Sequence, residues 1–131
     1  MEQTPIEDPR ARAFAETLQE FERSADPTAL VALFTDDATL TRLDARGERD
    51  DPEGFWREYR DQFDELRTTF EHAVEGEDRC ALEWTSSGTL ATGRSVEYRG
   101  VTVVEFAGES VSRLRTYYDT AAFTAVPAGT A

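Results

Sequence analysis

Four consecutive strand-like segments fill the C-terminal half of the chain, and they constrain its fold more than any other feature. Glycine-containing connections, GED, TGR and AGE, separate the segments, as short hairpin turns require. A run of hairpins builds an antiparallel sheet, and such a sheet needs an apolar layer over one of its faces. The four segments are TTFEHAVE, RCALEWTSS, SVEYRGVTVVEFA and SVSRLRTYYD.

The N-terminal half supplies that layer. Three Asp-Pro pairs, at positions 8–9, 26–27 and 51–52, each place a capping carboxylate before a proline at the first position of a helix. Apolar residues follow each pair at helical spacing, and a short strand over 38–43 separates the second and third helices. We therefore predict an α+β fold, in which a curved antiparallel sheet packs against three N-terminal helices and encloses a pocket. The stripe of the third helix is expected to consist of Phe55, Tyr59, Phe63 and Leu66.

The length of 131 residues fits one domain. We assign residues 8–125 to it and expect 1–7 and 126–131 to be flexible termini. The apolar runs are too short to cross a bilayer, and the segment MEQTPIEDPR has no apolar signal core. No membrane partner is therefore expected, and the predicted location is cytoplasmic.

The charged residues and the single cysteine exclude several kinds of site. A formal net charge of −13 repels phosphate backbones, so nucleic acid is a poor partner. One cysteine and one histidine are too few ligands for a usual zinc site, and we predict neither a metal nor a cofactor. Cys80 opens the apolar stretch CALEW, which favours a small buried hydrophobe over a nucleophile.

The order of these segments resembles a known family. Three stretches carry the resemblance to the SnoaL-like group of the nuclear transport factor two-like superfamily: LVALFTDDATL, FWREYRDQF and RTYYDTAAF. The C-terminal half, from TGRSVEYRG onward, is most similar to limonene epoxide hydrolase. The resemblance implies a cone-shaped fold around a pocket, often in a homodimer. Members include epoxide hydrolases, polyketide cyclases, ketosteroid isomerase and pocket proteins without chemistry, so the fold alone does not fix the function.

The catalytic residues of those relatives are absent from the matching positions. The epoxide hydrolases use an Asp-Arg-Asp set assisted by Tyr and Asn, and ketosteroid isomerase uses a Tyr, a carboxylate base and a protonated Asp. The resemblance therefore implies the pocket but no named chemistry. The residues found here at those positions are Leu18, Leu40, Arg42, Glu83, Thr85, Thr102 and Thr116.

Several of these positions are nonetheless expected to face the pocket. Glu83 lies between Leu82 and Trp84 in a strand expected to be buried, where its pKa would rise. It is a candidate general acid or base with Arg42 as its partner, and the alternative is a structural ion pair. His72 is a further catalytic candidate, with a hydrogen-bonded strand histidine as the alternative. The predicted ligand-binding residues are Trp56, Tyr59, Thr85, Thr102, Thr116 and Tyr118.

Two classes of function stay open. The first is a cofactor-independent isomerase, cyclase or hydrolase that acts on a small, mostly apolar, oxygenated molecule. The second is a non-catalytic ligand-binding domain or a dimeric scaffold. A homodimer is expected because Leu82, Trp84, Val101 and Val103 would be exposed on the outer sheet face unless a second subunit covers them.

Overall fold

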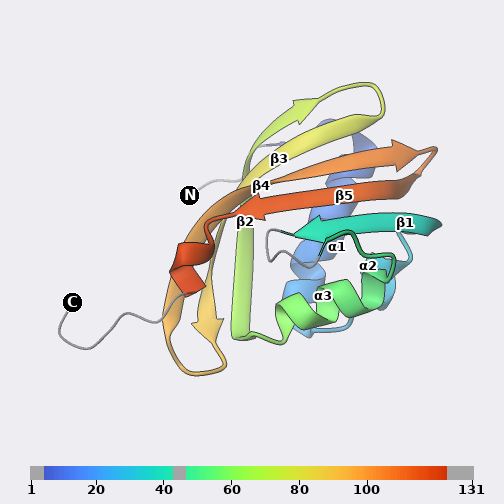
Figure 1. Ribbon diagram of the computed structural model, residues 1–131. Coiled ribbons are helices and arrows are strands. Elements are labelled where there is room, and N and C mark those ends of the chain that lie inside the picture. The colour runs from blue at the N-terminus through green and yellow to red at the C-terminus, as the bar shows by residue number, and fades with distance from the viewer. Residues whose placement is uncertain (1–4, 43–46, 124–131) are drawn as a thin grey trace.

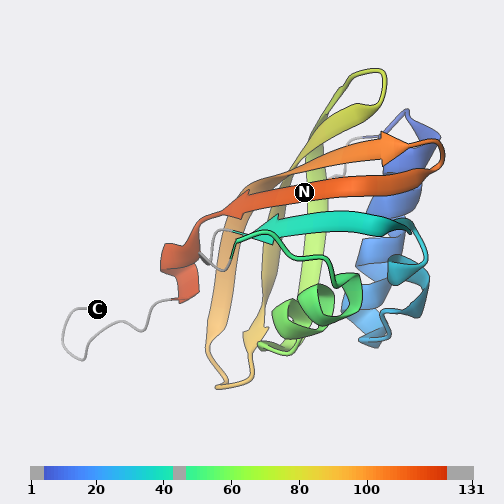
Figure 2. The same ribbon diagram turned by 45° about the vertical axis from the view of Figure 1, so that its right-hand side comes forward.

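The computed structural model describes residues 5–42 and 47–123, and it places a helical layer on one face of a strongly bent sheet (Figures 1 and 2). Helix α1 packs against β2, and α3 packs against β1. The predicted α+β fold is confirmed. In chain order the elements are α1 (Pro9–Ser24), α2 (Thr28–Val31), β1 (Phe34–Arg42), α3 (Pro52–Arg60), β2 (Phe63–Glu75), β3 (Arg79–Leu90), β4 (Ser95–Ala107), β5 (Ser110–Tyr118) and the 3₁₀ helix η1 (Thr120–Phe123).

The first and third Asp-Pro pairs begin α1 and α3 as predicted. The Asp8 carboxylate accepts a hydrogen bond from the backbone N–H of Arg10 at 2.8 Å, and Asp51 accepts one from Gly54 at 3.1 Å. Each carboxylate satisfies a backbone donor that the first turn leaves without a helical partner. Asp26 accepts a hydrogen bond from the backbone N–H of Thr28 at 3.0 Å, but the prediction is wrong by one residue there, because Pro27 rather than Asp26 is the N-cap of the one-turn helix α2.

The strand order in the sheet is β1-β5-β4-β3-β2. Strands β2 to β5 form the predicted antiparallel meander, whereas β1 runs parallel to β5 along the other edge (Figure 1). The helix α3 makes this geometry possible, because it carries the chain from β1 at one edge to β2 at the opposite edge. The sheet is therefore antiparallel except for its first strand.

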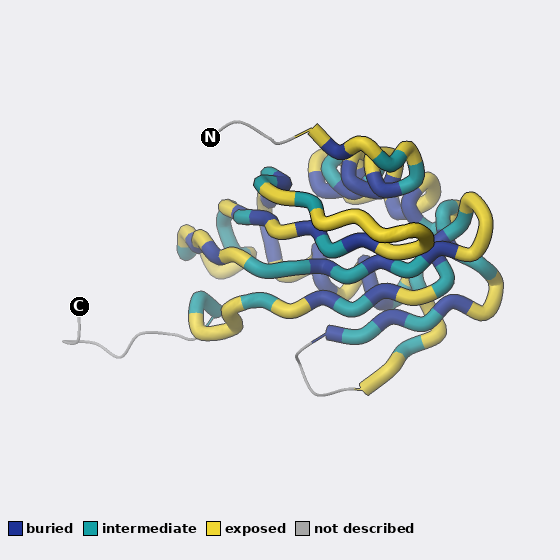
Figure 3. The backbone as a smooth tube through the Cα atoms, turned by 90° about the horizontal axis from the view of Figure 1, so that it is seen from above, coloured by how far each residue is buried: buried dark blue, intermediate teal, exposed yellow. Residues whose placement is uncertain are grey.

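Burial alternates along the strands, as the tube in Figure 3 shows. One face, which we call the inner face, contacts the helices and carries Phe70, Leu82, Val104 and Leu114, all at most 1% exposed. The N-terminal segment joins this core through Ile6, which is 6% exposed, although it lies in a stretch predicted to be flexible. Three predicted parts lie outside the described residues. They are Leu43 at the end of the predicted strand, residues 1–4, and the C-terminal segment 126–131, predicted to be flexible.

The third helix is shorter than predicted. It ends at Arg60, and Phe63 and Leu66 belong to β2 instead. A register irregularity between Phe63 and Glu65 lets both apolar side chains be buried although they are three positions apart. Such a bulge shifts the alternation of a strand by one residue, so that its spacing imitates a helix.

The two faces of β3 are the reverse of those predicted. Leu82 and Trp84 lie in the core, at 0% and 5% exposure, rather than on an outer face that a second subunit covers. Glu83 lies on the outer face with its side chain 61% exposed. The apolar alternation alone favoured this arrangement, because it places Leu82 and Trp84 inside. The resemblance to the epoxide hydrolases implies the opposite face, because it places the position of Glu83 in the pocket.

Gly100 of β4 occupies a position where the sheet has no room for a side chain. A Cβ there would meet the carbonyl oxygen of Tyr117 and lie 2.8 Å from Cζ2 of Trp84. We expect Gly100→Ala to lower the free energy of unfolding by about 1–3 kcal/mol in urea titrations, because backbone must move. Gly76→Ala is the matched control, since its Cβ would meet neighbours only at 3.5 Å. Equal losses for the two variants would contradict this packing.

Candidate functional site

A small cavity lies between the helices and the inner face of the sheet. Its free volume is about 20 Å³, which is room for about one water molecule. The predicted pocket therefore exists, but side chains fill most of it. Six of the nine predicted site residues are on its wall. The lining residues are Leu18, Glu22, Arg42, Phe55, Trp56, Tyr59, Thr68, Trp84, Thr102, Thr116 and Tyr118.

The other three predicted site residues lie on the outer face. Nδ1 of His72 is 3.3 Å from Oε1 of Glu83, and both side chains are more than 60% exposed. Thr85 donates a hydrogen bond to Glu71 on the same face. The expectation that Glu83 is buried is wrong, and so is its pairing with Arg42, because the two residues lie on opposite faces. The Glu83 carboxylate is therefore accessible to solvent and lies outside the cavity.

Arg42 occupies the cavity wall as a fixed positive charge. Its Nη1 donates a hydrogen bond to the carbonyl oxygen of Phe55 at 2.7 Å. The guanidinium lies 4.4 Å from the centroid of the Phe55 ring, close enough for a cation–π contact. Arg42 is 8% exposed, and its neighbour across the β1–β5 pair is Thr116.

A chain of polar side chains crosses the inner face beside Arg42. Nε1 of Trp84 donates to the Thr102 hydroxyl at 2.8 Å, and that hydroxyl lies 2.8 Å from the hydroxyl of Thr116. Thr102 and Thr116 are adjacent across β4 and β5. The two threonines therefore lie together on the wall, as predicted, and one of them is already engaged by Trp84.

The cavity contains a carboxylate that the sequence analysis missed. Glu22 of α1 is 2% exposed, and its two oxygens accept hydrogen bonds from the backbone N–H and the hydroxyl of Thr68 at 2.9 and 2.5 Å. Burial raises the pKa of Glu22 to about 7, although Thr68 and the charges of Arg60 and Arg23 oppose the rise. Glu22 is thus an acid that titrates near neutral pH within the cavity wall.

A signal for Glu22 was present in the sequence. Glu22 follows Leu18 by four positions and continues the apolar stripe of α1, where an acidic residue is out of place. Acidic residues are so frequent in this chain that one more in a helix did not stand out. Its burial depends on Thr68, which is 46 positions away.

Hydrogen bonds continue from Glu22 across the sheet. The Thr68 hydroxyl lies 2.6 Å from the hydroxyl of Ser86. Ser86 is the direct partner of Tyr98 across β3 and β4, both side chains are buried, and their hydroxyls interact. The Tyr98 hydroxyl makes a short hydrogen bond with that of Tyr59. Burial raises the pKa of both phenols above the ordinary value, so they are neutral at physiological pH. We call this series, Glu22–Thr68–Ser86–Tyr98–Tyr59, the hydroxyl chain.

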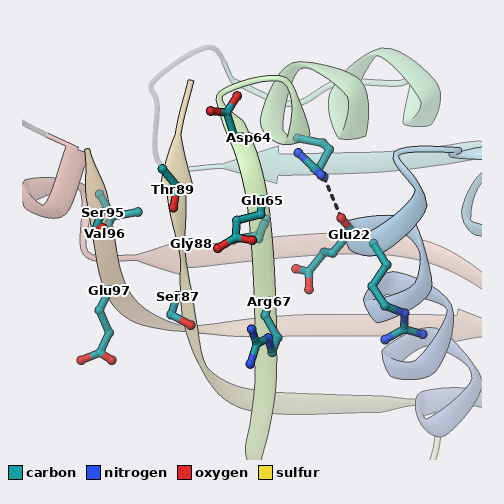
Figure 4. Close-up of a pocket in the computed structure, with 13 residues that line it drawn as sticks. Glu22, Asp64, Glu65, Arg67, Ser87, Gly88, Thr89, Ser95, Val96 and Glu97 are labelled. Carbon is teal, nitrogen blue, oxygen red and sulfur yellow. Dashed lines mark hydrogen bonds between the residues drawn. The ribbon is translucent and has the colours of Figure 1, made fainter. Parts of the chain in front are cut away.

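Glu22 also lines an open groove near the C-terminal end of α1 (Figure 4). The groove has a volume of about 760 Å³ and lies beside the beginning of β2. Arg60 fixes its helical rim by donating from Nε to the carbonyl oxygen of Glu22 at 2.9 Å, the bond that Figure 4 draws as a dashed line. The other charged residues that line it are Arg23, Asp64, Glu65, Arg67 and Glu97.

Trp56 is a residue of the cavity wall whose polar group the described part of the chain leaves unsatisfied. Its Nε1 is buried and has no hydrogen-bond partner among the described residues, and the side chain lines the cavity. A buried indole N–H without a partner costs free energy, because it has lost the hydrogen bonds of water. The ring is held by edge contacts with Phe55 and Tyr59, at centroid distances of 5.1 and 6.3 Å.

Other chemistries find little support in the described part of the chain. No group of three or more His, Cys, Asp or Glu there is arranged to hold a metal ion. Cys80 is buried as predicted, at 2% exposure, and burial raises its thiol pKa to about 12, so it is not a thiolate nucleophile. The helices of the described segments are each too short or too polar to cross a membrane.

Glu22 should make stability depend on pH. Its pKa rises from an ordinary value of 4.5 to about 7, so the folded chain binds the extra proton between these pH values. Stability is therefore highest below pH 4.5 with respect to this group and falls as pH rises through 7. Relative to Glu22→Gln, the wild type should lose about 3 kcal/mol of unfolding free energy across this range. Urea titrations at several pH values measure this difference.

Glu20→Gln provides the control for that experiment. Glu20 belongs to the same helix, but its side chain is 62% exposed, where it pairs with Arg23. Its removal should leave the pH profile nearly parallel to that of the wild type. A Glu22→Gln profile that also runs parallel would contradict the raised pKa.

Comparisons with known proteins agree with this geometry. The chain is similar to an NTF2-like protein from Anabaena variabilis, with a TM-score of 0.78, 14% identity, and coverage of 84% of this chain and 87% of that one. It is also similar to a proposed SnoaL-like polyketide cyclase from Jannaschia sp. CCS1, with a TM-score of 0.73, 15% identity, and coverage of 95% and 100%. Identities this low establish the fold alone.

A third similar structure is TerC, co-crystallised with polyporic acid, with a TM-score of 0.74, 16% identity, and coverage of 88% of this chain and 95% of that one. A sequence comparison with curated proteins found no match. The family model for the SnoaL-like domain matches residues 11–114, most of the described chain. This chain is therefore a member of the SnoaL-like domain family.

Proposed function

We propose that the inner cavity binds a small, mostly apolar, oxygenated molecule, and that Trp56 recognises its oxygen. The observation that carries this proposal is the buried Nε1 of Trp56, which lines the cavity and has no partner among the described residues. A ligand oxygen would satisfy this donor, while the rings of Phe55, Tyr59 and Tyr118 would contact its apolar part. The co-crystallisation of TerC with polyporic acid supports the same use of this fold.

The cavity must widen to take such a ligand. Its present volume of about 20 Å³ holds no more than a water, so binding has to displace side chains of the wall. The wall is rich in aromatic rings packed edge to face, and such contacts are each worth only about 0.5–1.5 kcal/mol beyond burial. A ligand with its own apolar surface can replace them.

Proton-transfer catalysis is the second candidate, and Glu22 favours it. A general acid or base works best when its pKa is close to the working pH, and the pKa of Glu22 is raised to about 7. Arg42 would stabilise negative charge that develops on a substrate oxygen. No cofactor enters this scheme. Product analysis on any compound that binds separates an isomerase, cyclase or hydrolase from a non-catalytic binding domain or scaffold.

The ligand proposal predicts a specific effect of removing the indole N–H. We expect Trp56→Phe to weaken binding of cyclohexanone by about threefold to tenfold, the worth of one hydrogen bond. Methylenecyclohexane has nearly the same shape but no acceptor, so its affinity should fall much less than that of cyclohexanone. Ligand-detected NMR titrations measure both. An equal loss for the two compounds would mean that Trp56 contributes only shape.

We also propose that the outer sheet face forms a homodimer, now without Leu82 and Trp84. Val101 and Val103 remain half-buried on this face beside Tyr117, which is 39% exposed, and together they leave an apolar patch. The resemblance to a superfamily of frequent homodimers supports dimerisation. A cytoplasmic location is retained as part of this proposal, because the lone buried thiol of Cys80 needs no oxidising compartment.

A charge placed in that patch should separate the subunits. We expect Val101→Glu to shift the protein from dimer to monomer in sedimentation velocity, because an ionised carboxylate would be desolvated at the interface. Ala91→Glu adds the same charge at the exposed β3–β4 turn and should leave the dimer intact. A wild-type protein that sediments as a monomer at high concentration would overturn the proposal.

A further inference from the structure

The hydroxyl chain has a property that its members lack separately. Each of its three inner hydroxyls, on Thr68, Ser86 and Tyr98, carries one proton and lies between two hydrogen-bond partners. A hydroxyl in this situation donates to one neighbour and accepts from the other. The whole series must therefore point in a single direction, either toward Glu22 or toward Tyr59.

The protonation state of Glu22 fixes that direction. An ionised carboxylate can only accept, so Thr68 donates to it, Ser86 to Thr68, Tyr98 to Ser86, and Tyr59 to Tyr98. The Tyr59 oxygen then has its proton directed away from the ligand and can only accept from one. When Glu22 gains a proton, it donates to Thr68, every hydroxyl rotates, and the Tyr59 proton turns toward the ligand.

We propose that Glu22 sets the direction of the hydroxyl chain and thereby decides which ligand oxygen Tyr59 binds. With Glu22 ionised, Tyr59 accepts a hydrogen bond from an alcohol or phenol. With Glu22 protonated, Tyr59 donates to a carbonyl. This inference rests on the proposed function of the cavity, because Tyr59 lines it. The proton on Glu22 comes from water of the open groove, and no other bond forms or breaks.

The surroundings of Glu22 suit this role. It is the one residue that lines both the inner cavity and the groove of Figure 4, among the described residues. The charged groups near it are Arg23 on its own helix and Arg60 on α3, which favour the ionised form and oppose the larger effect of burial. On β2 and β4 the groove adds Asp64, Glu65, Arg67 and Glu97, so its charges are mixed. The balance leaves Glu22 able to change state near neutral pH.

The direction of the chain can be tested without a ligand. The carbon-13 shift of tyrosine Cζ responds to whether its hydroxyl donates or accepts. The chain has four tyrosines, so labelling this carbon gives four signals. We expect the Tyr59 and Tyr98 signals to shift with the same midpoint, near pH 7, as the Glu22 carboxyl carbon. Tyr117 on the outer face is the internal control and should not follow this midpoint.

Two variants separate the chain from a general effect of pH. In Glu22→Gln the Tyr59 and Tyr98 signals should stay constant between about pH 5 and 9, below the ordinary range of phenol ionisation. In Ser86→Ala the carboxyl of Glu22 should still titrate, but the tyrosine signals should no longer follow it. Tyrosine signals that stay constant in the wild type while Glu22 titrates would overturn the proposal, and so would signals that still follow Glu22 in Ser86→Ala.

A matched pair of ligands tests the consequence. We expect the affinity of cyclohexanone relative to its methyl enol ether, 1-methoxycyclohexene, to be unaffected by pH, since both only accept. The affinity of cyclohexanone relative to cyclohexanol should instead fall by about threefold to tenfold from pH 5.5 to 8.5, and stay constant in Glu22→Gln. A constant ratio in the wild type would overturn the ligand part of the inference. Failure of every probe to bind, with the tyrosine shifts present, would overturn the proposed function and leave the switching chain.

Discussion

The burial of the Glu22 carboxylate is the interaction on which the rest of the site depends. A carboxylate 2% exposed is tolerated only if hydrogen bonds replace its water, and Thr68 supplies two of them. These bonds join the end of α1 to the middle of β2. Arg60 then joins α3 to both, through the carbonyl oxygens of Glu22 and Phe63. The elements α1, α3 and β2 are thus joined around Glu22, and Glu22 is itself an ionisable residue.

The curvature of the sheet determines which side chains can meet there. Irregularities in β2, between Phe63 and Glu65 and between Phe70 and His72, break its alternation twice. Bulges increase the local twist of a strand, which bends the sheet around the helices. Between the two irregularities of β2, Thr68 faces inward beside Ser86. On β4, Gly100 leaves space for the ring of Trp84. A regular β2 would continue the same alternation throughout and turn either Phe63 or Phe70 outward.

The sequence was sufficient for the fold and for much of the cavity wall, because both follow from local patterns. Asp8 and Asp51 mark helix starts by their own chemistry, and Arg42, Thr102 and Thr116 face inward with their strands. The failures arose where a long-range contact decided the outcome. Glu83 looked buried beside Trp84, yet the pleat turns it to water, and the Glu22–Thr68 contact joins residues 46 positions apart. Pattern alone does not report either the partner or the bulge.

The cavity reaches the surface differently at its two sides, and this separates the path of a proton from that of a ligand. At Glu22 it meets a groove lined by charged residues, across a carboxylate that hydrogen bonds fix in place. An apolar molecule gains nothing there and would have to break those bonds, whereas a proton needs only the carboxylate.

At the other side, Trp84 and Tyr118 line both the cavity and a groove on the outer face. Tyr118 is only half-buried and lies among the rings of Tyr59, Tyr98 and Phe123. Contacts between aromatic rings reorganise at lower cost than a buried carboxylate, so we expect an organic ligand to enter beside Tyr118 while protons exchange at Glu22.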